Sequence, residues 1–356
     1  MLNIIIYINH LKPGGAENQV YRLIKNYKKK NHKFFIVTKY KYSKKSFIKK
    51  FLKTNSKIIY LDQKYRGKIS QLFYLKSFIK KNNIKVVQSY LCGDNIFCTL
   101  LTIGTSLKHI SGYRGDYGNP VFKRSILQKL KNYISWYFSD LIVSNNQCGL
   151  KYLESLKLIN KNKIKYIPNG IHYPSLPKIK NNYKIIGCLS NFWQYKNHTT
   201  LIEAYAKIKN DYQLRLAGDG PEFHKCYELL EKNSCIPEEI LLGSIYDVDD
   251  FFKKIDIFIY PSLREGSPNS LLEAMSYGKF CLVSDIPEHR EALGPEVHVN
   301  CFFEPQRSDD LIKKILFWDK NKNEMLIQAK NNRNRIMKEY SIKILTNSFN
   351  RLYDSF

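Results

Sequence analysis

Short apolar runs alternate with longer amphipathic stretches along almost the whole chain, and this alternation occurs twice. Seven candidate strands come first, at residues 3–8, 34–38, 57–61, 84–89, 109–113, 140–144 and 164–167. Five more follow a break, at residues 184–189, 213–217, 239–243, 256–260 and 280–284. Strand–helix alternation of this kind predicts right-handed βαβ units and parallel sheets. The sequence therefore predicts an α/β protein with two doubly wound domains.

The break covers residues 168–182, which hold three prolines and one glycine and show no hydrophobic periodicity. We interpret it as a linker, because 356 residues suit two domains of roughly 150–200 residues each. We expect a basic N-terminal domain over 1–172 and a C-terminal domain over 173–340. Residues 308–356 are expected to be helical, and the helix over 341–356 is expected to pack back on the first domain.

The positive charge is concentrated in the first half of the chain. Residues 1–180 hold 35 Lys and Arg against 6 Asp and Glu, a formal charge of +29. The remaining residues hold 23 against 25, a formal charge of −2. Such an asymmetry points to an anionic partner for the first half, which could be nucleic acid, an anionic membrane surface or a phosphorylated substrate.

Other bulk features narrow the classes of protein. The eight cysteines are scattered without a C-x-x-C pair, which favours buried, reduced thiols in a cytoplasmic protein. The N-terminus lacks the basic stretch and cleavage site of a signal peptide. Residues 86–107 carry a single charge, Asp94, but their polar residues favour a buried strand and helix over a membrane span.

Residues 260–285 (YPSLREGSPNSLLEAMSYGKFCLVSD) carry the clearest chemical signal. Ser267 followed by Pro268 is typical of a helix start, with a hydroxyl N-cap and proline at the first helical position. Free backbone N–H groups in that first turn would bind an anion such as a diphosphate. Glu265 before the helix and Glu273 one turn into it could each accept hydroxyl hydrogen bonds from opposite ends of a ligand.

This stretch resembles the E-x7-E element of retaining glycosyltransferases with the GT-B fold, especially glycosyltransferase family four. The resemblance implies two Rossmann-like domains facing a cleft, with the acceptor on the side of the first domain (1–172) and the nucleotide-sugar donor held by the second (173–340). It implies that Glu273 binds the donor ribose, that Glu265 contacts the transferred sugar, and that the backbone amides after it hold the phosphates. Such enzymes need no metal, so no cofactor is expected.

Further segments resemble the same family in the same order, over about residues 1–340. These are the glycine-rich loop at 14–17, the P-N-G-[IV] element at 168–171, the loop at 190–197 and the G-[DE]-G-P loop at 217–222. Lys196 keeps the family's basic position, whereas Asn191 replaces an arginine, whose phosphate contact Arg264 could supply. The expected donor-binding residues are Gly14, Gly15, Asn191, Lys196, Gly218, Arg264, Glu265, Gly266, Ser267, Pro268, Asn269, Ser270 and Glu273.

Glu265, Lys196 and Arg114 are the expected catalytic residues. Arg114 follows a strand where many relatives carry a histidine near the sugar, and Asp116 is the nearest acid. His109, within the strand, is expected to belong to the core. The D-x-D at 247–249 is expected to cap a short helix and not to bind a metal.

Two Lys-rich amphipathic stretches, 39–53 and 120–137, could lie on an anionic membrane. The residues expected to enter the interface are Phe47, Ile48, Phe51, Ile126, Leu127 and Trp136.

The sequence thus predicts a retaining, metal-independent hexosyltransferase that uses a nucleoside-diphosphate sugar, with UDP favoured. The expected acceptor is a carbohydrate, lipid-linked, in bacterial surface polysaccharide (O-antigen or capsule) biosynthesis at the cytoplasmic face of the membrane. Two alternatives stay open: a basic nucleic-acid-binding protein, and a nucleotide-sugar-binding relative with other chemistry such as epimerisation.

Overall fold

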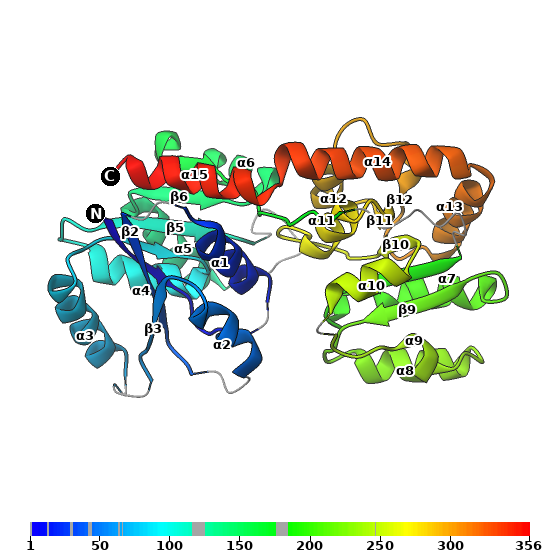
Figure 1. The fold of residues 1–356 in the computed structure, drawn as a ribbon, viewed down its shortest axis with the longest axis horizontal. Helices are drawn as coiled ribbons and strands as arrows, with labels where there is room; N and C mark the ends of the chain where they lie inside the picture. Colours follow the sequence, from blue (N-terminus) through cyan, green and yellow to red (C-terminus); the bar gives the residue numbers. More distant parts are fainter. Residues whose placement is uncertain are drawn as a thin grey trace. The chain divides into compact units, whose positions relative to one another are not determined.

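The computed structural model describes residues 2–12, 14–28, 31–41, 45–62, 65, 67–115, 125–175, 184–245 and 247–356. The chain divides into two compact units (Figure 1). Unit 1 comprises Met1–Gly170 together with Ile342–Phe356, and unit 2 comprises Ile171–Ser341. The sequence-based boundaries lay at 172/173 and 340/341, within two residues of these divisions.

Unit 1 is built on a seven-stranded sheet in which every neighbouring pair is parallel. The strand order is β3-β2-β1-β4-β5-β6-β7. The strands are β1 (Leu2–Tyr7), β2 (His32–Thr38), β3 (Ser56–Tyr60), β4 (Ile84–Ser89), β5 (Lys108–Tyr113), β6 (Leu141–Ser144) and β7 (Ile164–Tyr166).

Helices cover both faces of this sheet, which explains why its central strands bury side chains on both faces. On β1, Ile4 and Ile6 face one core while Ile5 and Tyr7 face the other. The first core also takes side chains from α1 (Gly15–Asn26), α2 (Lys45–Leu52) and α15 (Ile342–Asp354). The second face carries α3 (Lys68–Lys81), α4 (Cys92–Thr102), α5 (Ile126–Phe138) and α6 (Gln147–Ser155).

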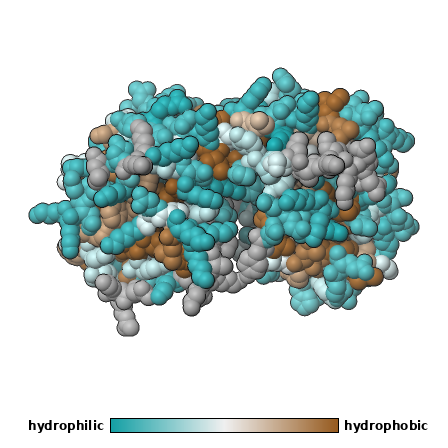
Figure 2. Space-filling model, in the orientation of Figure 1, coloured by the Kyte–Doolittle hydropathy of each residue, from teal (hydrophilic) through white to brown (hydrophobic). Residues whose placement is uncertain are grey.

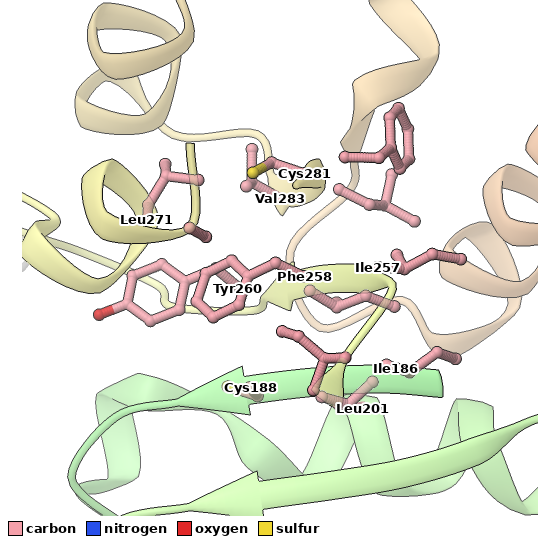
Figure 3. Packing of buried hydrophobic residues seen from close by; sticks show 14 of the residues in the cluster. Ile186, Cys188, Leu201, Ile257, Phe258, Tyr260, Leu271, Cys281 and Val283 are labelled. Carbon is pink, nitrogen blue, oxygen red and sulfur yellow. The ribbon is translucent and has the colours of Figure 1, made fainter. Parts of the chain in front are cut away.

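Unit 2 has a smaller parallel sheet in the order β12-β11-β10-β8-β9. Its strands are β8 (Ile185–Leu189), β9 (Gln213–Ala217), β10 (Ile257–Tyr260), β11 (Phe280–Ser284) and β12 (Phe302–Phe303). Its helices are α7 (His198–Ile208), α8 (Phe223–Lys232), α9 (Pro237–Ile240), α10 (Val248–Lys254), α11 (Asn269–Ser276), α12 (Pro287–Leu293), α13 (Ser308–Lys320) and α14 (Lys322–Glu339). Figure 3 shows the core of this unit, where Ile257 and Phe258 of β10 pack between Ile186 of β8 and Val283 of β11.

The predicted strand at 239–243 is wrong. Residues 237–240 form the short helix α9, and only Leu241 makes a bridge, to Leu216. Pro237 stands at the start of this helix with Glu238 and Glu239 in its first turn, which is a helix-start pattern. The apolar run that follows this helix start contributes one bridge residue, Leu241, at the edge of the sheet.

Three of the six residues expected to enter a membrane are part of the core instead. Phe51 of α2 is fully buried, Ile48 packs against the same cluster, and Trp136 of α5 is buried. Ile126 and Leu127 are exposed, at 85% and 58%. The side chain of Phe47 and residues 120–124 lie outside the described residues. None of the described helices combines the length and the apolar run that crossing a bilayer requires.

The remaining surface features follow the composition. The face of the molecule seen in Figure 2 is mainly hydrophilic, with separate apolar patches. Five of the described cysteines are buried free thiols: Cys98, Cys188, Cys226, Cys281 and Cys301. A cytoplasmic location stays a prediction.

Candidate nucleotide-sugar site

The topology of unit 2 brings two distant loops together. Strand β8 lies between β9 and β10. The chain passes from β8 to β9 on one side and later adds β10 on the other side, so the strand order reverses at β8. In open α/β sheets, ligands bind at the carboxyl ends of the strands where the strand order reverses. The loop after β8 carries Lys196 and the loop after β10 carries Glu265. Both loops open at this edge, and a backbone hydrogen bond from Leu263 N to Tyr195 O (2.8 Å) joins them.

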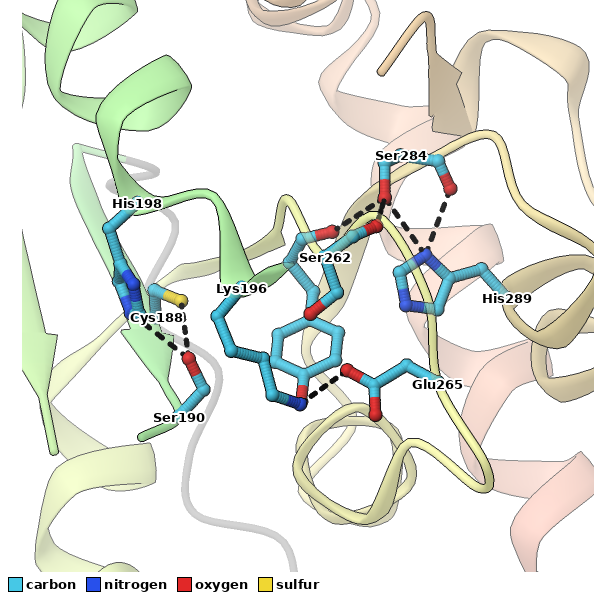
Figure 4. A network of polar contacts seen from close by, with 9 residues as sticks. Cys188, Ser190, Lys196, His198, Ser262, Glu265, Ser284 and His289 are labelled. Carbon is cyan, nitrogen blue, oxygen red and sulfur yellow. Dashed lines mark hydrogen bonds and ion pairs between the residues drawn. The ribbon is translucent and has the colours of Figure 1, made fainter. Parts of the chain in front are cut away.

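Lys196 and Glu265 form a buried ion pair at the centre of this edge (Figure 4). Lys196 Nζ donates to Glu265 Oε1 at 2.5 Å and to the hydroxyl of Tyr260 at 2.9 Å. The two charged side chains are 11% and 8% exposed. An ammonium group has three N–H donors. Two of the three are engaged by described residues, which leaves one for a ligand.

Electrostatics keep this pair charged. Burial alone would raise the pKa of Glu265, but the adjacent ammonium of Lys196 holds it below its usual value. Burial would likewise lower the pKa of Lys196, but the Glu265 carboxylate raises it. The same burial, with a smaller contribution from Glu265, raises the pKa of the Tyr260 hydroxyl. The edge therefore presents one fixed negative and one fixed positive group in a site with little water.

His289 of α12 lies behind this pair and was not predicted from the sequence. Its Nδ1 lies 2.9 Å from the backbone oxygen of Ser284, so that nitrogen carries the proton and donates. Burial lowers the pKa of His289 to about 4, and the ring is therefore neutral. The ring lies on the same side of the site as Ser262 and Glu265 in Figure 4. In the sequence His289 is followed by Arg290 and Glu291, and this charged run indicates an exposed helix and not a ligand site.

Glycines allow the second predicted loop to lie against the first. Gly218 has φ +140°, and a Cβ there would lie 1.9 Å from the backbone oxygen of Ser190. Gly220 has φ +159°, and its Cβ would meet the backbone of Phe192. Two backbone hydrogen bonds of 3.0 Å hold the loops together, one from Ser190 N to Ala217 O and one from Phe192 N to Asp219 O. The structure thus brings the 190–197 and 217–222 segments side by side.

The helix of the E-x7-E element starts one residue later than predicted. Helix α11 begins at Asn269, and Pro268 occupies the cap position without a side-chain cap hydrogen bond. Ser267 is therefore not the N-cap, although its carbonyl accepts from Asn269 N at 2.9 Å. Because proline at the cap has no hydroxyl group, the cap side chain does not compete with a ligand for the backbone N–H groups of the first turn. Ser270 lies in that turn.

The other predicted donor-binding residues lie around this edge. Arg264 stacks its guanidinium over the ring of Tyr195 at 4.4 Å, which places a second cation beside the loop of Lys196. Glu273 lies one turn into α11 and is half-buried, Gly266 is half-buried in the loop before it, and Asn191 is exposed. A direct role of these residues toward a donor stays a prediction.

Unit 1 holds the predicted residues Gly14, Gly15 and Arg114. Gly14 is the cap of α1, Gly15 its first residue, and the carboxyl of Glu17 folds back over Gly14. Arg114 follows β5, donates from Nη1 to Asn169 Oδ1 at 2.9 Å, and lies 4.3 Å from the ring of Tyr90. The structure thus joins Arg114 to the P-N-G element.

The remaining candidates are placed as follows. His109 is fully buried in β5 beside Ser89 and Ser139, as expected for a core residue. Asp116 lies outside the described residues. Asp247 caps α10 by accepting from Asp250 N at 2.9 Å, as predicted. In the part of the chain that the structure describes, no group of three acidic, His or Cys side chains is arranged to hold a metal ion.

Comparisons with known proteins agree with this architecture. The family model Glycosyltransferase Family 4 matches residues 13–173, and Glycosyl transferases group 1 matches residues 175–335. An N,N'-diacetylbacillosaminyl-diphospho-undecaprenol alpha-1,3-N-acetylgalactosaminyltransferase of Campylobacter jejuni is 23% identical over 80% of this chain and 81% of its own length. A UDP-Gal:alpha-D-GlcNAc-diphosphoundecaprenol alpha-1,3-galactosyltransferase of Escherichia coli is 29% identical over 54% of each chain.

Solved structures share the fold over the full chain. The Anabaena protein Alr3699/HepE in complex with UDP-glucose superposes with a TM-score of 0.85 at 15% identity, covering 100% of both chains. The alignments with the first three curated relatives, by contrast, span only 27–57% of the length of those proteins. Two family models that together match residues 13–173 and 175–335, and a fold of two Rossmann-like units, show that this chain belongs to the GT-B glycosyltransferases of the family-four, group 1 type.

Proposed function

We propose that this protein transfers a hexose or N-acetylhexosamine from a nucleoside-diphosphate sugar, with UDP favoured, to a lipid-linked carbohydrate acceptor. The Lys196–Glu265 pair carries this proposal, because it places a buried cation and a buried carboxylate at the ligand-binding edge of unit 2. The names of the relatives, which act on diphospho-undecaprenol-linked sugars, support the acceptor class and a role in bacterial surface polysaccharide (O-antigen or capsule) biosynthesis.

Lys196 would stabilise the charge that develops on the leaving diphosphate. Its remaining N–H can donate to a phosphate oxygen, and in a site with little water such a donor stabilises developing charge strongly. Arg264 beside it would add a second positive charge. We further propose that the reaction retains the anomeric configuration and needs no metal.

Glu265 and Glu273 would orient the donor. The Glu265 carboxylate has a second oxygen that can accept a sugar hydroxyl, while Oε1 keeps Lys196 in place. Glu273, one turn into α11, would accept the two ribose hydroxyls. Gly218 supports the site indirectly, because it lets the loop after β9 approach the loop that carries Lys196.

A titration of the nucleotide tests the donor site. We expect UDP to bind with micromolar affinity in a calorimetric titration, more tightly than GDP or ADP, and Glu273→Ala to abolish that binding. Glu231→Ala on α8 of the same unit is a control, because its side chain is exposed. Equal UDP affinity of both variants would contradict the assignment of the ribose to Glu273. Absence of binding of every nucleotide to the folded protein would refute the proposed function.

We also propose that unit 1 attaches the protein to an anionic membrane surface through α5. This helix buries Trp136 but exposes a stripe of apolar side chains at helical spacing beside the exposed Lys129 and Lys131. The stripe consists of Ile126, Leu127, Leu130, Ile134, Tyr137 and Phe138. Exposed apolar residues beside lysines suit the interface of an anionic bilayer. A peripheral location at the cytoplasmic face would give access to a lipid-linked acceptor.

A further inference from the structure

Unit 2 has a groove outside the edge that carries Lys196 and Glu265, between the loop after α12 and one face of α14. Its volume is about 360 Å³, at the small end of the range of about 300–1,000 Å³ that is typical of ligand sites. All of its lining residues lie between Leu293 and Glu339, so the groove belongs to unit 2 alone. The residues expected to bind the nucleotide sugar are not among them. The groove is therefore a separate feature of this unit.

One wall of the groove is a polar stripe of α14. The lining residues of this helix stand three or four positions apart, which brings them to one face. Four of their side chains are amides, and an amide can both donate and accept hydrogen bonds. These are Gln328, Asn331, Asn332 and Asn334. Asn331 and Asn334 are exposed, so a ligand in the groove can reach them.

The opposite wall is mainly apolar, and a glycine brings it close to α14. The chain leaves α12 through Gly294, whose φ of +92° favours glycine. A Cβ at this position would lie 2.8 Å from the guanidinium carbon of Arg335. The loop can therefore lie directly against the helix. It lines the groove with Leu293, Pro295 and Val297, and only Glu296 adds a charge.

Arg335 joins the two walls. Its Nε donates to the backbone oxygen of Ala292 and its Nη2 to that of Glu291, both at 3.0 Å. Its Nη1 donates to Glu339 Oε1 at 2.7 Å. A guanidinium group has five N–H donors. Three of them are engaged by described residues, so one N–H on each Nη atom is left for a ligand.

The charges of the groove cancel. Arg335 and Lys338 contribute two positive charges, and Glu296 and Glu339 contribute two negative charges. An anion in the groove would lose hydration without gaining a net Coulomb attraction. A sugar ring suits both walls, because its C–H groups can pack on the apolar loop. Its hydroxyl groups can donate to and accept from the amides, and accept from the guanidinium group. The groove thus has the chemistry of a site for a neutral saccharide.

We propose that this groove binds a neutral sugar residue of a saccharide chain, with hydroxyl groups bonded to Asn331, Asn334 and Arg335 and the C–H face of the ring on Pro295 and Val297. It is a second carbohydrate site of unit 2, away from the edge of the transfer reaction, so its ligand binds without a nucleotide. That the sugar belongs to a saccharide chain rests on the proposed transferase function, whereas the groove itself does not.

Binding of small saccharides in the absence of nucleotide tests the groove. The probes are the methyl α-glycosides of galactose and N-acetylglucosamine, and the disaccharides lactose and N,N'-diacetylchitobiose. Saturation-transfer NMR gives the dissociation constants. We expect a disaccharide to bind in the millimolar range and more tightly than the single sugars, because the second ring adds contacts. Asn331→Ala combined with Asn334→Ala should weaken that binding about tenfold, because two side chains that donate and accept are lost.

Matched variants assign the binding to the groove. Asn323→Ala replaces an exposed asparagine in the first turn of the same helix, outside the groove, and should bind the saccharide like wild type. Asn331→Trp fills the groove from an exposed position and should abolish the binding. All three variants should keep the affinity of wild type for UDP in a calorimetric titration.

Four results would overturn the inference: no saccharide bound to wild type, saccharide binding that is unchanged in both groove variants, tighter binding of inorganic phosphate, or a preference for the single sugars. Absence of UDP binding to wild type would refute the proposed function instead, and saccharide binding would still decide whether the groove is a carbohydrate site.

Discussion

Replacing Lys196 with methionine is expected to destabilise unit 2 by about 3–5 kcal/mol. The substitution keeps the length of the side chain but removes the cation from Glu265, whose carboxyl is only 8% exposed. Breaking a buried ion pair by removing one partner leaves an uncompensated charge in a medium that solvates it poorly, which gives this magnitude. Glu265→Gln is expected to be destabilising for the same reason, since it leaves the ammonium of Lys196 with Tyr260 alone.

The double variant distinguishes this account from a simple loss of packing. Lys196→Met combined with Glu265→Gln removes both charges and nearly preserves the volume, so it should be less destabilised than the sum of the single variants by at least about 2 kcal/mol. The exposed pair Lys207–Asp309, at 2.7 Å in the same unit, is a matched control. Its cycle should show almost no coupling, because water screens both groups.

The pH dependence of the single variant follows from the same charges. In wild type the lowered pKa of Glu265 contributes stability that is present above pH 4.5 and is lost as the pH falls through the folded-state pKa. Without Lys196, burial acts unopposed and raises the pKa of Glu265. The defect of Lys196→Met should therefore shrink as the pH is lowered from 7 to 4.

Urea unfolding followed by hydrogen exchange of peptides from β8, β10 and α11 measures these differences within unit 2. Additive single-variant effects, or a defect of Lys196→Met that is unchanged at pH 4, would refute the reasoning.

Three further predictions concern single features of the two units. Raising the pH from 4 to 7 should lower the free energy of unfolding of unit 1 by about 3 kcal/mol through the raised pKa of Glu17 alone, because the folded state retains a proton that the unfolded chain releases. Because burial also raises the pKa of Asp94, Glu17→Gln combined with Asp94→Asn should reduce this pH dependence, measured by urea unfolding with hydrogen exchange of α1 and α4. Leu127→Gln combined with Leu130→Gln should reduce co-sedimentation with vesicles containing anionic lipid while leaving UDP affinity unchanged. Gly218→Ala should abolish UDP binding in a calorimetric titration, because its Cβ would overlap a backbone oxygen and alanine disfavours φ +140°.

Eleven of the twelve predicted strands could be located from the sequence, most clearly those that are buried on both faces, such as β1 and β10. A run such as that of β1, with Ile4 and Ile6 facing one core and Ile5 and Tyr7 the other, is apolar without interruption. Strand β12, of two residues, is too short to give such a pattern. The failure at 239–243 shows the limit, since a short apolar run after Pro237 does not reveal how many of its residues pair.

The site was predictable only where a local pattern exists. The E-x7-E stretch marks Glu265, but the pairing with Lys196 joins residues 69 positions apart and arises from the order of the strands. Tyr260 is the last residue of an apolar strand, a position at which the sequence predicts a core residue and not a partner of Lys196.

The assignment of α15 to unit 1 has a consequence for how the chain is made. Leu345, Phe349 and Tyr353 fill the core that β1 and α1 begin, so residues 2–170 emerge from the ribosome without the side chains that complete their own core. Unit 2, by contrast, is contiguous and can fold as soon as it has been synthesised. Although unit 1 is translated first, it should be the last to reach its native state, and until residues 342–356 have appeared its open apolar surface is a target for chaperones.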